Sequence, residues 1–164
     1  MGSNLDEIGL IVEMLGQTFD GRAWHGPSFM DILDGVDKTQ ASQRPIESRH
    51  TIWEIVDHCS YWMEAVTGAL HGEKLPDIAS TEDWTQMGET DEDWTETRYR
   101  LKRVYEELVN SIEEFDKSLF TQEIRGSFHS QIYTVTYRKM LHGISDHNTY
   151  HAGQIAVLRK KTVR

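Results

Sequence analysis

Residues 134–160 read TVTYRKMLHGISDHNTYHAGQIAVLRK, and this stretch decides the fold class. It contains no proline, and at 1.5 Å per residue a helix of this length spans about 40 Å. One set of its side chains recurs at intervals of three and four residues: Met140, Ile144, His147, His151, Ile155 and Leu158. This spacing is typical of one face of an α-helix. We predict a single long helix whose apolar face, which includes two histidines, packs against the protein core.

The rest of the chain carries the same helical period in shorter stretches, separated by its three prolines. Thr51-Ile-Trp-Glu54 fits a capping box, and His71-Gly72 fits a helix end. The predicted helices cover residues 4–19, 29–36 with Ser28 as the cap, 51–72, and about 90–116 with Thr90 or Asp91 as the cap. Residues 73–89 are expected to form a polar connection, and Ile124 to Phe128 fits either a short extended piece or a turn.

Four long amphipathic helices predict an all-α fold, a four-helix bundle, formed by residues 1–164 as a single domain. An up-down-up-down bundle prefers short connections, but about thirty residues separate the first two long helices and nearly twenty separate the next two. We therefore expect at least one long crossover connection. The opening Met1-Gly2-Ser3 is interpreted as a remnant of cloning.

Composition limits the partners and the compartment. The 27 acidic and 17 basic residues give a formal charge of −10, which repels a phosphate backbone, so no nucleic-acid partner is expected. No apolar run approaches 18 residues, so no membrane span is expected either. The single cysteine, Cys59, and the lack of a leader pattern favour the reducing cytoplasm.

The histidines are the strongest functional signal in the sequence, which contains eight of them. His147 and His151 are four residues apart, so both rings lie on one helix face and can share a metal ion. His58, between Ile55 and Trp62, holds the same kind of position on the 51–72 helix and can supply a third ligand. Three imidazoles leave a further position on zinc, nickel or iron. Spacing alone equally allows core histidines that hydrogen-bond to carbonyl and carboxylate oxygens.

Two segments resemble a known family. Residues 142–159, HGISDHNTYHAGQIAVLR, look like the signature of the DinB and YfiT-like superfamily of metal-binding four-helix bundles. The closing helix of that family carries a histidine, three residues, a second histidine, a small residue and Gly-Gln-Ile, matched here from His147 to Ile155. Its third histidine stands in a context similar to Ile52-Trp-Glu-Ile-Val-Asp-His58, followed by an aromatic residue such as Trp62.

The resemblance implies a helical bundle, often a homodimer, that holds one divalent ion per chain on His58, His147 and His151. Some relatives are metal-dependent transferases or isomerases that use bacillithiol, mycothiol or glutathione, and many have no assigned activity. A thiol that enters the open metal position would be deprotonated and become a nucleophile. We therefore expect a thiol S-transferase acting on small electrophiles. The alternative is a non-catalytic, dimeric metal-binding bundle with a structural or stress-response role.

Several neighbours of this centre could orient the rings or move a proton, although each also fits a purely structural role. Within one helical turn of the proposed ligands lie Glu54, Tyr150 and Gln154. In the loop Trp24-His-Gly-Pro27, His25 could act as a proton shuttle.

Three further residues are interpreted by their expected burial or exposure, apart from the metal site. Cys59 is rotated about 100° from His58 around the helix and is interpreted as a buried apolar residue. Trp53 and Trp84 are expected to face solvent, where they could form part of a dimer surface.

Overall fold

The computed structural model describes residues 6–78, 83–85, 87–128 and 131–162, which confirms that the chain is mostly helical. Met1–Ser3 lie outside these residues. Within them the α-helices are α1 (Glu7–Phe19), α2 (Phe29–Leu33), α3 (Lys38–Ser42), α4 (Ile52–Leu70), α5 (Asp91–Glu113) and α6 (Tyr137–Arg159). The strands are β1 (Asp77–Ile78), β2 (Glu123–Phe128) and β3 (Gln131–Thr136), and a 3₁₀ turn covers Lys117–Leu119.

Each long helix begins at a capping residue, whose side chain accepts a hydrogen bond from a backbone N–H group of the first turn. Thr90, rather than Asp91, caps α5. The predicted capping box of α4 is confirmed, since the Glu54 N–H donates to Thr51 Oγ1 at 3.1 Å and the Thr51 N–H donates to Glu54 Oε2 at 2.8 Å. These contacts fix where α4 begins and therefore the phase of every side chain that follows on it.

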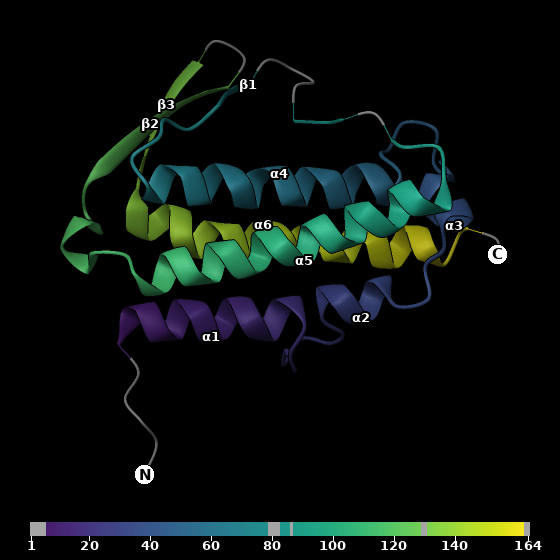
Figure 1. Ribbon diagram of the computed structural model, residues 1–164, viewed down its shortest axis with the longest axis horizontal. Coiled ribbons are helices and arrows are strands. Elements are labelled where there is room, and N and C mark those ends of the chain that lie inside the picture. Colours follow the sequence, from purple (N-terminus) through teal and green to yellow (C-terminus); the bar gives the residue numbers. More distant parts are fainter. Residues whose placement is uncertain (1–5, 79–82, 86, 129–130, 163–164) are drawn as a thin grey trace.

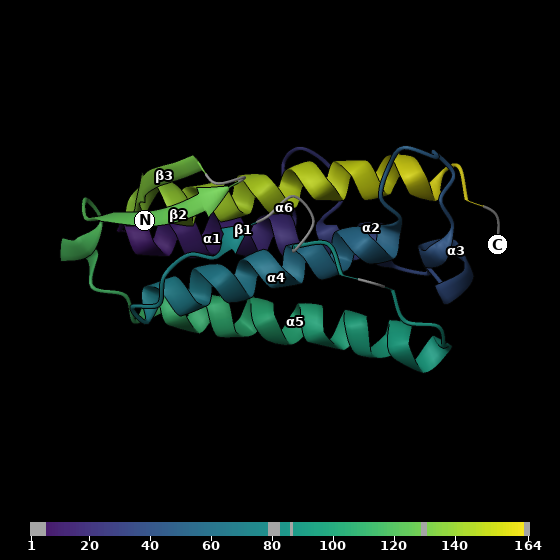
Figure 2. The same ribbon diagram turned by 90° about the horizontal axis from the view of Figure 1, so that it is seen from above.

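The four long helices lie side by side along the molecule (Figures 1 and 2). Helix α4 packs against α5 and α6, and α1 packs against the same two helices. Both views show α4 and α5 running in the same direction, so the connection between them returns along the length of the molecule. The contact of α4 with α6 matters most, because these two helices carry the histidines singled out above.

The short elements correct the sequence-based boundaries. The helix expected over 29–36 ends at Leu33, since Gly35 adopts a φ of 69°, in the left-handed region that favours glycine. Helix α3 was not predicted, because its sequence Lys38-Thr-Gln-Ala-Ser42 contains a single apolar residue and so shows no helical period. Trp53, expected to face solvent, is buried and packs against Trp94 with ring centroids 5.2 Å apart.

The expectation of an all-α chain is wrong in one respect, because the chain also forms a small sheet. Strands β2 and β3 pair antiparallel, with Glu123 opposite Thr136, and the two residues of β1 pair parallel to β2. The extended alternative for Ile124 to Phe128 is therefore the correct one. Residues 134–136, predicted as helix, end β3, because Thr136 caps α6 through the Lys139 N–H. None of the helices in the described part of the chain is long and apolar enough to cross a membrane.

Candidate metal centre

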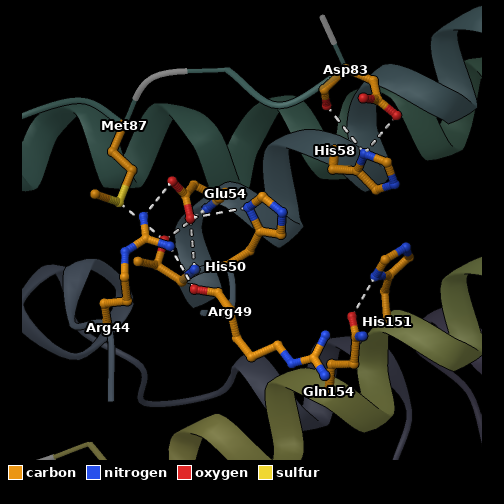
Figure 3. Close-up of polar contacts among 10 residues, drawn as sticks. Arg44, Arg49, His50, Glu54, His58, Asp83, Met87, His151 and Gln154 are labelled. Atoms are coloured by element: carbon orange, nitrogen blue, oxygen red, sulfur yellow. Dashed lines mark hydrogen bonds and ion pairs between the residues drawn. The ribbon is translucent and has the colours of Figure 1, made fainter. Parts of the chain in front are cut away.

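The structure brings His58 from α4 together with His147 and His151 from α6. One ligand nitrogen from each ring lies within 4.8 Å of the others, and His58 Nε2 lies 3.1 Å from His147 Nε2. His58 and His151 are each 5% exposed, whereas His147 is half-buried. Figure 3 shows the rings of His58 and His151 facing one another across the gap between the two helices. The cluster therefore has an inner side within the protein and one more accessible side at His147.

An oxygen acceptor lies beside Nδ1 of each ring. His58 Nδ1 is 3.1 Å from the backbone carbonyl oxygen of Asp83, and His151 Nδ1 is 2.7 Å from Gln154 Oε1. His147 Nδ1 is 3.4 Å from Asn148 Oδ1, a longer contact. Because these oxygens accept and do not donate, they favour the tautomer with the proton on Nδ1 in each ring. The Nε2 lone pairs are then left to point into the cluster.

Burial keeps the three rings neutral. It lowers the pKa of His58 from 6.5 to about 4 and that of His147 to about 3, and it also lowers the pKa of His151. In His147 the neighbouring rings of His151 and His58 lower the pKa further. A metal ion needs neutral imidazole, so no proton has to be removed from these rings at pH 7 before an ion binds.

The arrangement fits a divalent ion. Two Nε2 lone pairs at 3.1 Å repel unless a metal ion or a proton lies between them, and a metal ion leaves both rings with their protons on Nδ1. Two nitrogens about 2.05 Å from one tetrahedral zinc ion are separated by about 3.3 Å, close to the distance between His58 Nε2 and His147 Nε2. The three histidines could therefore hold a metal ion, and imidazole donors suit zinc, nickel and iron alike.

The connection between α4 and α5 contributes two residues that sequence reasoning missed. Asp83 is buried beside His58, and its carboxylate accepts a hydrogen bond from Trp62 Nε1 at 3.2 Å. The ring of Trp84 stacks on the ring of His58 at a centroid distance of 3.9 Å. Residues 73–89 were expected to form a polar connection, and Trp84, which was expected to face solvent, is half-buried. A tryptophan next to an aspartate in that polar stretch was the one available signal.

The other candidate residues occupy three different environments. Gln154 accepts from His151, and its own Nε2 donates to the Tyr150 hydroxyl at 3.0 Å. Glu54 instead caps α4 and pairs with Arg44 at 2.7 Å, so it contacts none of the three histidines within the described residues. His25 is exposed, and its ring contact in the described structure is with Trp24.

Cys59 is fully buried, as predicted, and burial raises the pKa of its thiol. A protonated, inaccessible thiol is neither a metal ligand nor a nucleophile.

A comparison with protein families finds a match over most of this chain. The model of the DinB superfamily matches residues 24–155, a range that includes His58, Asp83, His147 and His151. The chain belongs to the DinB superfamily. A search of curated proteins gave no match to this DinB chain. Family membership therefore comes from the family model, and the geometry of the centre comes from the structure.

Proposed function

We propose that this DinB-superfamily chain binds one divalent ion on His58, His147 and His151 and acts as a thiol S-transferase on small electrophiles. The observation that carries the proposal is the convergence of three neutral rings, two buried and one half-buried, whose Nδ1 atoms all face oxygen acceptors. A divalent ion held by these three imidazoles would keep a further position and would lower the pKa of a thiol bound there, so that the thiol proton is released to solvent. In the transfer, the sulfur forms a bond to an electrophilic carbon while the leaving group departs with its electron pair.

Tyr150 and Gln154 are suited to handle the leaving group. The Tyr150 hydroxyl accepts from Gln154 Nε2, so its own proton remains available for donation. The Tyr150 side chain is 64% exposed, and its ring lies 5.0 Å from the ring of His151. Gln154 holds this hydroxyl and the His151 ring together. The pair can therefore donate a hydrogen bond to a departing anion at the accessible edge of the centre.

Arg49 favours an anionic thiol. This exposed residue precedes α4, and Figure 3 shows its side chain extending toward α6 on the side of Gln154. Within the described residues, no hydrogen bond or ion pair engages its guanidinium, although the chain has a formal charge of −10. A guanidinium on the Gln154 side of the centre suits a carboxylate. Glutathione and bacillithiol carry carboxylates, whereas mycothiol does not.

The experiment is a thiol-consumption assay with zinc-loaded, nickel-loaded and iron-loaded protein. Bacillithiol, glutathione and mycothiol are each supplied with monochlorobimane as the electrophile. We expect metal-dependent consumption that disappears in His147→Ala and persists in His142→Ala, which alters a partly exposed histidine of the same helix. Consumption no faster than the uncatalysed reaction with all three thiols and all three metals would contradict the proposal.

Substitution of Arg49 tests the choice of thiol. We expect Arg49→Gln to raise KM for glutathione or bacillithiol about tenfold, because a charge-assisted hydrogen bond is worth about 1.5 kcal/mol. KM for mycothiol should stay unchanged. Arg22→Gln, at an exposed site in the loop after α1, is the control. An equal effect of Arg49→Gln on all three thiols would remove the argument for a carboxylate.

A second function is favoured by the depth of the site. Because His58 and His151 are each 5% exposed, the ion could instead serve only to hold α4 and α6 together. Such a protein would gain stability from the metal without consuming any thiol. Exchangeable water on bound Mn²⁺ or Co²⁺, measured by water-proton relaxation, separates the two functions, because a structural ion offers no position to water.

The architecture and assembly of the chain complete the proposal. We propose that α1, α4, α5 and α6 form a four-helix bundle in which the connection after α4 is the long crossover. We also propose a homodimer, whose oligomeric state sedimentation equilibrium would measure. A monomer at micromolar concentration would remove that part of the proposal.

A further inference from the structure

The strongest feature outside the three proposed ligands is the segment Asp83-Trp84, which comes from the connection between α4 and α5 and covers His58. Asp83 is 5% exposed, which is unusual for an aspartate, since a buried carboxylate is costly unless it is paired. Its partners are therefore informative about its role. In the described part of the chain, these partners are the ring N–H groups of His58 and Trp62 on one face of α4.

Asp83 contacts His58 through two of its groups. The backbone carbonyl oxygen lies 3.1 Å from His58 Nδ1, and the carboxylate Oδ2 lies 3.4 Å from the same nitrogen. Oδ2 also accepts the indole N–H of Trp62 at 3.2 Å, which fixes the carboxylate in place. Both groups of Asp83 favour a proton on His58 Nδ1. They therefore leave the Nε2 lone pair directed at His147.

The negative charge of the carboxylate also offsets the positive charge that the centre would gain with a bound ion. Its field reaches His147 and His151 as well as His58, since the Asp83 charge favours protonation of both rings on α6. Three neutral imidazoles leave the charge of a divalent ion uncompensated within the protein. The fixed carboxylate of Asp83, on the far side of the His58 ring from the cluster, reduces the free-energy cost of burying that charge.

The ring of Trp84 covers one face of the His58 ring. It stacks on His58 at 3.9 Å with an interplanar angle of 6°, and His50 stacks on the other face of Trp84 at 3.4 Å and 7°. The ring of His151 meets Trp84 edge-on at 6.1 Å. This layered arrangement limits rotation of the His58 ring and excludes water from that side of it.

We propose that Asp83 is the positioning residue of the centre, which sets the tautomer and orientation of His58, and that Trp84 locks the ring in that orientation. The inference rests on the proposed function, because it requires an ion on the three histidines. It adds that the crossover connection is an integral part of the centre. Metal affinity then depends on residues that lie outside both ligand-bearing helices.

The test measures zinc affinity by competition with a chromophoric chelator. Asp83→Asn keeps the volume and an acceptor for Trp62 but removes the charge, so we expect zinc to bind about 10- to 100-fold more weakly. Glu89→Gln removes one exposed charge from the same connection and should leave the affinity within twofold. For the stacked ring, Trp84→Leu should weaken binding, whereas Trp24→Leu, at a 95% exposed tryptophan, should not.

A spectroscopic readout separates positioning from a general loss of structure. In ¹⁵N-labelled, metal-free protein we expect His58 to show the Nδ1–H tautomer. Asp83→Ala keeps the backbone carbonyl but removes the carboxylate and the bond to Trp62 that anchors this segment, so it should shift His58 toward a mixture of the two tautomers. This measurement needs no metal, so it still tests the inference if the wild-type chain binds none. If Asp83→Asn fails to fold, Trp62→Phe, which frees the carboxylate, should give a smaller loss of affinity.

The outcomes are distinct. Wild-type affinity in Asp83→Asn, together with an unchanged His58 tautomer in Asp83→Ala, overturns the inference and leaves the three-histidine site intact. Absence of zinc binding in the wild type overturns the proposed function instead, and the tautomer then decides the role of Asp83 by itself.

Discussion

At the scale of single residues, Gln154 links the centre to its accessible edge. Its carboxamide accepts from His151 Nδ1 at 2.7 Å and donates to the Tyr150 hydroxyl at 3.0 Å. Gln154→Leu keeps the size of the side chain and removes both bonds. We expect zinc affinity to fall about tenfold, because the orientation and tautomer of His151 are no longer fixed.

The control for this substitution is Gln17→Leu on α1, where the glutamine contacts the exposed Glu13. Chelator competition on both variants measures the difference. An affinity of Gln154→Leu equal to that of Gln17→Leu would mean that packing alone orients His151.

The buried rings also predict how stability depends on pH. The pKa of His58 lies at about 4 in the folded chain and at 6.5 ordinarily, so between these values the unfolded chain binds a proton that the folded chain does not. The stability that the neutral His58 ring contributes is therefore fully present above pH 6.5 and is lost as the pH falls toward 4. The contribution of His147 is lost over a range that extends toward pH 3. At about 1.4 kcal/mol for each pH unit, His58 alone contributes about 3 kcal/mol.

Urea denaturation of metal-free protein between pH 7.5 and 4 measures this loss. His58→Gln should flatten the pH dependence, whereas His25→Gln, in an exposed loop, should leave it unchanged. A wild-type stability that stays constant down to pH 4.5 would show that the rings are not buried as neutral groups.

At the scale of elements, the start of α4 sets the position of His58, and Glu54 belongs to that start. Glu54 accepts the Thr51 N–H at 2.8 Å and pairs with Arg44 at 2.7 Å. We expect Glu54→Ala to lower the free energy of unfolding by about 1–2 kcal/mol, since a capping partner and a half-buried ion pair are lost. Zinc affinity of the folded variant should stay within twofold, because Glu54 contacts none of the three histidines in the described structure.

Urea denaturation and chelator competition together test this role of Glu54. Glu96→Ala, at an exposed site on α5, serves as the matched control. A large loss of zinc affinity with unchanged stability would return Glu54 to the metal centre.

The elements also show which parts of the fold the sequence could predict. Helices of 13 or more residues repeat their apolar positions several times, so α1, α4, α5 and α6 were found with errors of a few residues at their ends. Helix α3, with five residues, has no such repeat. The hairpin was missed because β3 runs directly into α6, and its β-branched residues were attributed to the helix.

At the scale of the whole molecule, the centre joins segments that are distant in sequence. The ligand spacing on α6 and the face of α4 predicted that His58, His147 and His151 would meet, and the structure brings them together. Asp83 and Trp84 could not be placed in this way, because a connection has no periodicity that fixes where its side chains point. Their positions follow from the path of the connection back along α4.

Metal binding should stabilise this arrangement, because an ion bound to the folded chain alone shifts the folding equilibrium. At zinc concentrations 100-fold above Kd the gain is about 2.7 kcal/mol. For a chain of 164 residues this corresponds to a rise in Tm of about 5–10 °C. Differential scanning calorimetry with zinc and then with excess chelator measures the rise and its reversal, and a Tm that zinc does not change would argue against a site in the core.

The central claim is most directly tested by the metal content of tag-free protein, measured by elemental mass spectrometry after incubation with zinc and gel filtration. The wild-type chain, His58→Ala, His147→Ala and the control His142→Ala are compared. The account predicts one ion per chain in the wild type and in His142→Ala, and none in the other two variants. No ion in the wild type, or an undiminished ion in His58→Ala and His147→Ala, would contradict it.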